Sequence, residues 1–272
     1  MLYFIPTPIG NLSDISFHSL EVLQKCELLL CEDTRVCRFL ISLLNDKFKL
    51  AIKPRKILAF HTHNEKTFLQ SIDTSFFEEC VVYMSDAGMP GISDPGQILI
   101  EYAIKNNIQY EVLSGSNAAL LAIVSSGFCH KEFIFMGFLA NKSIQRKKDI
   151  AKLMLNPYPS VVYEAPTRII DLVKEISKID PLREIFIIKE ATKKFENKFK
   201  TSAHNAVEKL QNMDLRGEWC VVVAPKLEQF YQSTICEEDI LNLDLPLKIK
   251  SKLLSKINAK SPKENYQKLL LS

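Results

Sequence analysis

Short apolar runs alternate along most of the chain with segments whose apolar residues recur at helical spacing. The runs are rich in Val, Ile, Leu and Phe, and polar or turn-forming residues bound them, which is typical of strands. The pattern predicts strands at 2–5, 27–30, 56–60, 80–84, 109–113, 133–136, 160–164, 184–188 and 219–224. It predicts helices near 14–25, 34–45, 64–78, 95–106, 117–126, 143–154, 167–178 and 203–213.

Regular alternation of strands and helices predicts an α/β fold. Because most of the strands are apolar throughout, we expect sheets that are covered on both faces and mostly parallel. A chain of 272 residues with 47% hydrophobic content suits two lobes better than one core. We therefore predict two α/β lobes with mostly parallel sheets and a small C-terminal helical extension. The expected boundaries are 1–116, 117–230 and 231–272.

The C-terminal segment differs from the rest of the chain in its pattern of apolar and polar residues. Ile249, Leu253 and Ile257 recur every four positions, which places them on one helical face. The sequence SPKE at 261–264 combines an N-cap serine, a first-turn proline and a capping-box glutamate. These signals predict two short helices in this segment.

The charge of the chain is unevenly distributed. Residues 246–272 carry seven lysines and one glutamate, a net charge of +6, whereas the whole chain has a net charge of only +3. Further basic stretches lie at 142–148, 189–200 and 53–56. Such patches fit a polyanion such as RNA, but solvated lysine-rich surface has the same composition.

Several other classes of site are not indicated. The seven cysteines form no CxxC pair and lie mostly in apolar runs, which predicts reduced, buried thiols. His61 and His63 lack a third ligand at motif spacing, so we predict no metal. No apolar stretch approaches the roughly 18 to 20 residues of a membrane span, and the N-terminus does not have the pattern of a signal peptide. We expect a cytoplasmic protein without a membrane partner.

Glycine is scarce, with eight in the chain, which is under half of the usual share of roughly 7%. Five of the eight follow predicted strands: Gly10 the first, Gly88, Gly91 and Gly96 the fourth, and Gly115 the fifth. In open parallel sheets, ligands bind outside the carboxyl ends of the strands. The glycines therefore predict one ligand cleft built from three loops.

The stretch 85–96, SDAGMPGISDPG, is the richest of these loops. Its glycine spacing matches neither a Walker A loop nor a Rossmann fingerprint. Ser93 or Asp94 is expected to cap a helix that begins at Pro95. Asp86, inside the loop, suits a polar contact with a nucleotide-like ligand. A tight connection with a capped helix and no ligand is the alternative interpretation.

An ordered set of motifs spans nearly the whole chain. They are PTPIGNLSDIS (6–16), CEDTR (31–35), HTHNE (61–65), SDAGMPGISDPG (85–96), SGSNAALLAIVSSGF (114–128), FMGFL (135–139), YEAPTRI (163–169), KEATKKFE (189–196) and GEWCVVV (217–223). The set resembles the ribosomal RNA small subunit methyltransferase I family, a branch of the tetrapyrrole methylase superfamily. The first, second and fourth motifs are the most specific.

This resemblance implies a homodimer that binds S-adenosylmethionine between its lobes. It implies 2′-O-methylation of a decoding-centre cytidine, with small-subunit ribosomal RNA or the small ribosomal subunit as the partner. The cofactor contacts that it implies are Pro8, Gly10, Ser85, Asp86, Gly88, Met89, Gly91, Ile92, Ser114, Gly115, Asn117, Ala118, Ala119, Phe138 and Ala165. The chain departs from the family at 114–117, where SGSN replaces a turn with two prolines, and at Met89, where threonine is common.

Methyl transfer requires the ribose hydroxyl to be held in line at roughly 3 Å while water is excluded. A nearby base helps, because an unactivated hydroxyl is a poor nucleophile. The candidates for that base at strand ends are Glu32, Asp33, Glu65, Glu164, Glu190 and Lys193. The sequence does not choose among them. The catalytic set that we predict is Glu32, Asp33, Arg35, Glu65 and Lys193.

Two other functions stay open at this stage. A tetrapyrrole C-methyltransferase of the same superfamily would bind a macrocycle rich in carboxylates, which basic loops also suit. An RNA-binding or cofactor-binding module without turnover would keep the glycine loops. The basic C-terminal segment and the EDTR and HNE motifs favour RNA as the partner.

Overall fold

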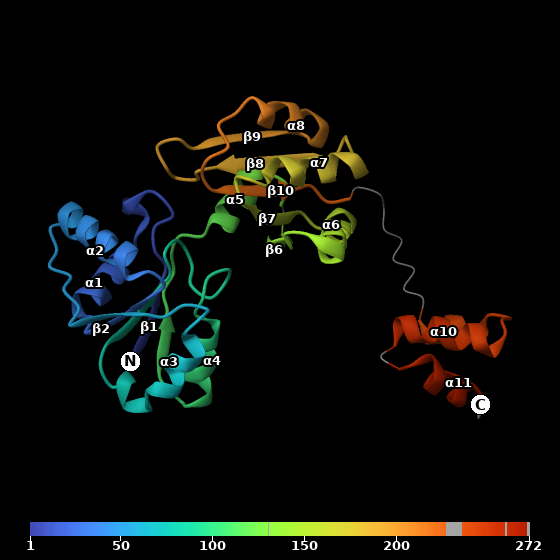
Figure 1. Cartoon of the computed structure of the whole chain (residues 1–272), viewed down its shortest axis with the longest axis horizontal. Coiled ribbons are helices and arrows are strands. Elements are labelled where there is room, and N and C mark those ends of the chain that lie inside the picture. Colours follow the sequence, from blue (N-terminus) through green and yellow to red (C-terminus); the bar gives the residue numbers. More distant parts are fainter. Residues whose placement is uncertain (130, 227–235, 259, 271–272) are drawn as a thin grey trace. The chain divides into compact units, whose positions relative to one another are not determined.

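The structure is a computed structural model that describes residues 1–129, 131–226, 236–258 and 260–270. The chain forms two compact units, Met1–Lys226 and Leu227–Ser272. The first unit contains two α/β lobes, each built around one five-stranded sheet (Figure 1). The predicted domain boundary after residue 116 remains a prediction, and the boundary after residue 230 lies outside the described residues.

The first lobe has a wholly parallel sheet with strand order β3-β2-β4-β1-β5. All five strands therefore end at the same edge of the sheet. The strands are β1 (Leu2–Ile5), β2 (Leu28–Cys31), β3 (Lys56–Ala59), β4 (Val81–Met84) and β5 (Tyr110–Val112). The helices are η1 (Leu12–Asp14), α1 (Phe17–Lys25), α2 (Thr34–Phe48), α3 (Glu65–Ser71), η2 (Thr74–Phe77) and α4 (Gln97–Lys105).

Helices cover both faces of this first sheet. Leu29 of β2 packs in a core cluster with residues of α1 and α2, whereas its neighbour Leu30 packs in a second cluster with residues of α3 and α4. Successive strand residues point to opposite faces, so two-sided burial requires an uninterrupted apolar run. For this lobe, the predicted parallel sheet covered on both faces is confirmed.

The second lobe has strand order β6-β7-β10-β8-β9. Its strands are β6 (Ile134–Phe138), β7 (Ser160–Glu164), β8 (Glu184–Lys189), β9 (Asn197–Ser202) and β10 (Trp219–Val223). Its helices are α5 (Ala118–Ser126), α6 (Ser143–Leu155), α7 (Ile169–Ile179) and α8 (Ala203–Gln211). Among the described strand pairs of this sheet, only β6 and β7 are parallel.

The expectation of mostly parallel strands was therefore wrong for the second lobe. The cause is that its sheet is also covered on both faces. Val161 packs with residues of α5 on one face, and Val162 packs with residues of α6, α7 and α8 on the other. An apolar run indicates that a strand is buried on both faces, and it does not indicate whether the strand is parallel or antiparallel to its neighbours.

Strand β9 was not predicted from the sequence, and α4 begins two residues later than predicted. In β9 the lysines are exposed and Phe199 is its one buried residue, as suits a charged edge strand. The helix α4 begins at Gln97 with Gly96 at the N-cap and no side-chain cap, so the predicted cap at Ser93 or Asp94 was wrong. A hydrogen bond from the Tyr83 hydroxyl to the Pro95 carbonyl (2.8 Å) holds the turn instead.

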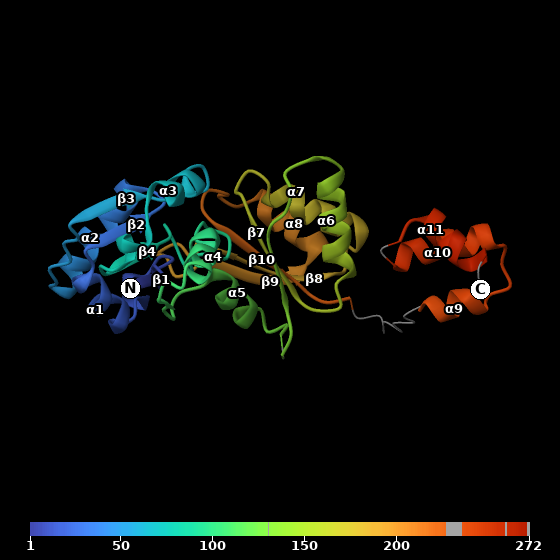
Figure 2. The same ribbon diagram turned by 90° about the horizontal axis from the view of Figure 1, so that it is seen from below.

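The second unit contains the predicted helical extension. Its described helices are α9 (Glu237–Asn242), α10 (Leu247–Ile257) and α11 (Pro262–Leu270) (Figure 2). The capping box of α11 is confirmed, because Ser261 N donates to Glu264 Oε2 (2.7 Å) and Glu264 N donates to Ser261 Oγ (3.3 Å). In the described part of the chain, no helix is long and apolar enough to cross a membrane.

Candidate functional site

The loops after β1 and β4 are fastened to each other at the carboxyl edge of the first sheet. Thr7 N donates to the Gly88 carbonyl and Gly88 N donates to the Thr7 carbonyl, both at 3.0 Å. The Thr7 hydroxyl also donates to the Ser85 carbonyl (3.2 Å), and the Ser85 hydroxyl donates to the Gly88 carbonyl (3.0 Å). Backbone positions in the predicted ligand loop are therefore fixed by a buried network.

Gly88 is one of the positions in this loop that favour glycine. Its φ of 86° lies in the left-handed region. A Cβ at this position would also lie 3.3 Å from Cγ2 of Ile9. The left-handed backbone strains any residue with a side chain here, and its Cβ would also press on Ile9.

A cavity of about 360 Å³ lies between this loop and the second lobe. This volume falls within the range of small-molecule sites, which is roughly 300–1,000 Å³. From the first lobe it is lined by Ile9, Ala87, Gly88, Met89, Ile92, Ser93 and Asp94. From residues 117 onward it is lined by Asn117, Ala118, Phe138, Tyr163, Glu164, Ala165, Pro166, Ile188, Ala191, Gly217, Glu218, Trp219 and Cys220.

The cavity brings together about half of the residues that were predicted to contact a cofactor. Those that line it are Gly88, Met89, Ile92, Asn117, Ala118, Phe138 and Ala165. The structure places the remaining eight outside its lining, namely Pro8, Gly10, Ser85, Asp86, Gly91, Ser114, Gly115 and Ala119. Some of these support the wall: Ser85 bonds the Gly88 carbonyl, and Ala119 packs into the core beside β7 and β10.

Sequence reasoning missed most of the wall that the second lobe contributes. Tyr163, Ile188, Trp219 and Cys220 lie at or next to the ends of β7, β8 and β10 and line the cavity. They belong to apolar runs that were interpreted as strand core. The only signal in the sequence was the chain's single tryptophan, which lies two residues after Gly217.

The charged groups on the cavity wall are acidic. Asp94, Glu164 and Glu218 line it, and none of the described lining residues is lysine or arginine. Burial, together with the nearby charges of Asp86 and Glu218, raises the pKa of Asp94 to about 6. Glu164 pairs with two arginines and Glu218 pairs with Lys193, so Asp94 is the lining acid, among the described residues, whose charge is left to attract a cationic ligand.

Glu32 extends this acidic region at the end of β2. Its Oε1 accepts a hydrogen bond from Asp86 N (3.3 Å), and Asp86 Oδ1 accepts one from Asp33 N (3.2 Å). Burial, followed by the negative charges of Asp94 and Asp86, raises the pKa of Glu32 to about 7. A carboxylate with a pKa near neutrality is suited to exchange a proton at physiological pH.

Two other candidate bases have their carboxylates engaged by arginine. Asp33 pairs with Arg35 (Oδ2 to NH2, 2.6 Å), and the hydrogen bonds from Arg35 hold the pKa of Asp33 well below its usual range. Glu164 is buried, and its oxygens accept from Arg146 (3.0 Å) and Arg168 (2.7 Å). Both carboxylates are therefore occupied by ion pairs.

Lys193 and Glu190 pair with each other. Lys193 Nζ lies 3.0 Å from Glu190 Oε1 and 3.1 Å from Glu218 Oε2. Burial alone would lower the pKa of Lys193, but the hydrogen bonds to Glu190 and Glu218 outweigh it and raise the pKa. Lys193 is therefore protonated at neutral pH. The remaining candidate, Glu65, is buried in the first turn of α3.

The loop that joins β8 and β9, residues 190–196, also contacts the first lobe. Asn11 N donates to Thr192 Oγ1 (3.1 Å). A Cβ at Gly10 would lie 2.5 Å from Cγ of Lys193, so this approach depends on glycine. The 190–196 loop therefore joins the lobes beside the cavity, whose wall includes Ala191.

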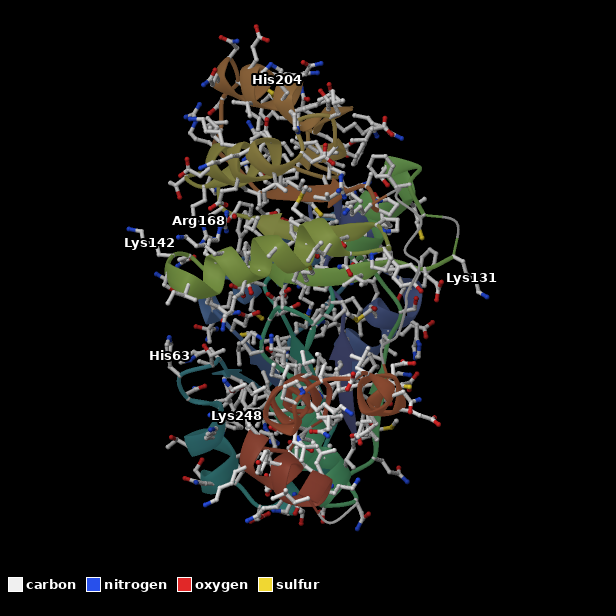
Figure 3. All side chains as sticks on the ribbon, turned by 90° about the vertical axis from the view of Figure 1, so that its right-hand side faces the viewer. His63, Lys131, Lys142, Arg168, His204 and Lys248 are labelled. Carbon is white, nitrogen blue, oxygen red and sulfur yellow. The ribbon has the colours of Figure 1, made fainter. Side chains whose placement is uncertain are left out.

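The basic stretch at 142–148 contains both exposed and buried cations. Lys142 projects outward at the start of α6, and Lys131 projects outward on the other side of the lobe (Figure 3). Arg146 instead points inward and pairs with Glu164 and Glu175. In the described part of the chain, no group of three or more His, Cys, Asp or Glu side chains could hold a metal ion.

Comparison with known proteins gives the class. Residues 1–206 match the family described as Tetrapyrrole (Corrin/Porphyrin) Methylases, and the chain belongs to this family.

Within the family, the chain is 53% identical over 271 residues to the ribosomal RNA small subunit methyltransferase I of Campylobacter fetus subsp. fetus (strain 82-40), covering 99% of this chain and 100% of the relative. It is 41% identical to the protein of the same name from Helicobacter pylori (strain ATCC 700392 / 26695), covering 100% of this chain and 98% of the relative. The resemblance inferred from the motifs is confirmed.

Solved structures share the fold at low sequence identity. The cobalt precorrin-4 methyltransferase structure has a TM-score of 0.59 at 14% identity, covering 82% of this chain and 94% of that one. Uroporphyrin-III C-methyl transferase from Thermus thermophilus, complexed with S-adenyl homocysteine, has a TM-score of 0.55 at 12% identity, covering 81% and 96%. The predicted tetrapyrrole methylase-like α/β fold is confirmed.

Proposed function

We propose that this protein is an S-adenosylmethionine-dependent methyltransferase of small-subunit ribosomal RNA. The reaction is 2′-O-methylation of a cytidine ribose at the decoding centre. The names of relatives that match over the full chain support the RNA substrate. The structural observation that carries the proposal is the acid-lined cavity between the loop after β4 and the second lobe.

The cavity residues suit this cofactor. S-adenosylmethionine carries a sulfonium and an amino group, both positive, and Asp94 offers negative charge at the wall. Ile92 and Phe138 add apolar surface for the adenosyl part, and the backbone at Gly88 leaves room for close approach. When bound, the cofactor supplies an electrophilic methyl group.

Glu32 is the general base in this proposal. Its carboxylate accepts the proton of the ribose hydroxyl, which makes the oxygen a better nucleophile. The other candidates are less suited, because Asp33 and Glu164 are paired with arginines and Lys193 is held protonated by two carboxylates. Asp86 N fixes the orientation of Glu32 through its hydrogen bond.

The charge of the cavity disfavours a tetrapyrrole substrate. Such macrocycles carry several carboxylates, which cationic side chains would have to bind. The described cavity wall offers Asp94, Glu164 and Glu218 and no lysine or arginine. RNA approaching this unit from outside instead meets exposed lysines such as Lys142.

Homodimer formation and a cytoplasmic location belong to the same proposal. Strand β5 is an edge of the first sheet with Val112 exposed, and α5 exposes Leu120 and Val124, the latter at 79%. Apolar surface of this kind suits a subunit interface. A Val124→Asp variant should then sediment as a monomer while the wild type sediments as a dimer. The cytoplasm is where ribosomal RNA meets such an enzyme.

The test is transfer of a labelled methyl group from S-adenosylmethionine to small ribosomal subunits from cells that lack this protein. Nucleoside analysis should then place the label in 2′-O-methylcytidine. Label in any other methylated nucleoside would refute 2′-O-methylation of cytidine. No label in subunits or in naked ribosomal RNA, with cofactor binding shown by calorimetry, would leave a binding module as the better function.

A further inference from the structure

The 190–196 loop is held in an unusual conformation. Glu190 and Thr192 have φ values of 52° and 63°, in a region that non-glycine residues seldom adopt. Bonds inside the loop hold it: Thr192 N donates to Glu196 Oε2 (2.8 Å), and Lys193 N donates to the Glu190 carbonyl (3.0 Å). Residues in such conformations persist where the surroundings fix them, and they cluster at functional sites.

The loop is also anchored from both sides. Glu190 Oε1 accepts a hydrogen bond from Glu218 N (2.9 Å) next to β10, and Thr192 Oγ1 accepts one from Asn11 N in the first lobe. These anchors fix its base against both lobes. A side chain presented by this loop therefore has a defined position relative to the cavity.

What the anchored loop presents to solvent is an aromatic ring beside a cation. Phe195 is 74% exposed, and Lys194 Nζ lies 5.6 Å from its ring centroid. Lys193 and Lys198 are paired with glutamates, but among the described residues Lys194 has no carboxylate within ion-pair distance. The loop thus engages both of its acids in hydrogen bonds and ion pairs and leaves a ring and a positive charge without a carboxylate partner at the surface.

This pair is close to the cavity. Ala191 lines the cavity, and four residues of chain span at most about 14 Å. Proteins bind single-stranded nucleic acid by stacking bases on exposed aromatic rings while neighbouring cations contact phosphate. The exposed Phe195 offers a ring for base stacking, and Lys194 beside it offers a positive charge for a phosphate.

We propose that Phe195 and Lys194 form a subsite for the single-stranded RNA that flanks the methylated nucleotide. The Phe195 ring stacks on a base, and Lys194 contacts a phosphate of the same strand. This subsite rests on the proposed function, because it needs an RNA substrate at the cavity.

Kinetics on small ribosomal subunits test the subsite. Phe195→Ala should raise the KM for subunits at least tenfold, with kcat and the Kd for S-adenosylmethionine unchanged, and Phe195→Trp should restore the KM. The matched control is Leu182→Ala, since Leu182 is equally exposed but precedes β8, at the opposite end of that strand. A KM unchanged in Phe195→Ala, or a weakened cofactor affinity, would overturn the subsite.

Fluorescence gives an independent readout. The chain has one tryptophan, Trp219, which is buried, so Phe195→Trp adds a single exposed indole. Titration with a short single-stranded oligocytidylate should quench it, whereas a duplex of equal length should not. If wild-type protein methylates RNA but the new indole is unaffected by the oligocytidylate, the subsite is refuted and a ribosomal protein is the better partner for this loop. If wild-type protein transfers no methyl group at all, the proposed function itself fails.

Discussion

The two lobes build the two sides of one cavity by different means. The first lobe brings five parallel strand ends to one edge and forms its wall mainly from the loop after β4, where Gly88 has a left-handed backbone. The second lobe has a mostly antiparallel sheet and forms its wall with side chains such as Tyr163 and Trp219. The first side therefore depends on the backbone conformation of one loop, and the other side depends on the shape of side chains from several strands.

This difference predicts where substitutions do most harm. On the first side a residue that cannot adopt the left-handed backbone of Gly88 distorts the whole loop, so we expect large, all-or-none effects there. On the second side a truncated side chain removes contact area, so we expect graded effects. Substitutions on the two sides of the cavity should therefore differ in the size of their effect on cofactor binding.

Gly88→Val should abolish cofactor binding. The valine would impose a side chain at a left-handed φ and against Ile9. Gly127→Val is the matched control, because Gly127 also has a positive φ (65°) but a Cβ there meets nothing within 4 Å. Both variants should lose some thermal stability, but only Gly88→Val should show no heat of S-adenosylmethionine binding in calorimetry. Normal binding by Gly88→Val would remove this loop from the site.

Glu32→Gln should lower kcat by about 10²–10⁴-fold, the usual contribution of a general base, with little change in cofactor affinity. The wild-type rate should rise with pH through about 7 and level off above it, because the base acts only when deprotonated and the pKa of Glu32 is raised to about 7. The variant should lack this rise. Asp33→Asn serves as the comparison, since Asp33 is paired with Arg35 and should affect kcat far less. The reverse ranking would transfer the role to Asp33.

These first two positions also show what could be predicted from sequence. Gly88 and Glu32 were both predicted, because a scarce glycine and an acid after a strand are visible in a one-dimensional pattern. Strand directions in the second lobe could not be predicted. Val161 and Val162 are both apolar because β7 is buried on both faces, and a parallel or an antiparallel strand shows this same pattern. The role of Trp219 at the cavity was hidden for the same reason. The pairing that disfavours Glu164 as a base depends on Arg146, which is 18 residues away in sequence and becomes a neighbour only in the fold.

On the second side of the cavity, Phe138→Ala should weaken S-adenosylmethionine binding by about tenfold without abolishing it. Phe138 is exposed and contacts Tyr163 edge to face, so its loss removes apolar contact area while the core stays intact. Leu155→Ala, an exposed apolar position on α6 of the same lobe, is the control and should bind normally. Complete loss of binding in Phe138→Ala would mean that the two lobes do not differ in this way.

The smallest effect is expected outside both lobes, in α10 of the second unit. Replacing Lys248, Lys252 and Lys256 with glutamine keeps helix propensity and removes three positive charges. If these lysines contact RNA phosphates, each lost contact should lower the slope of log affinity against log salt by roughly 0.7–0.9, so affinity should fall most at low salt. Cofactor affinity and the rate at saturating RNA should not change, because the cavity lies wholly within the first unit. An unchanged salt slope in a filter-binding titration would mean that the lysines of α10 are solvated surface, and the lobes alone would then have to supply the contacts with RNA.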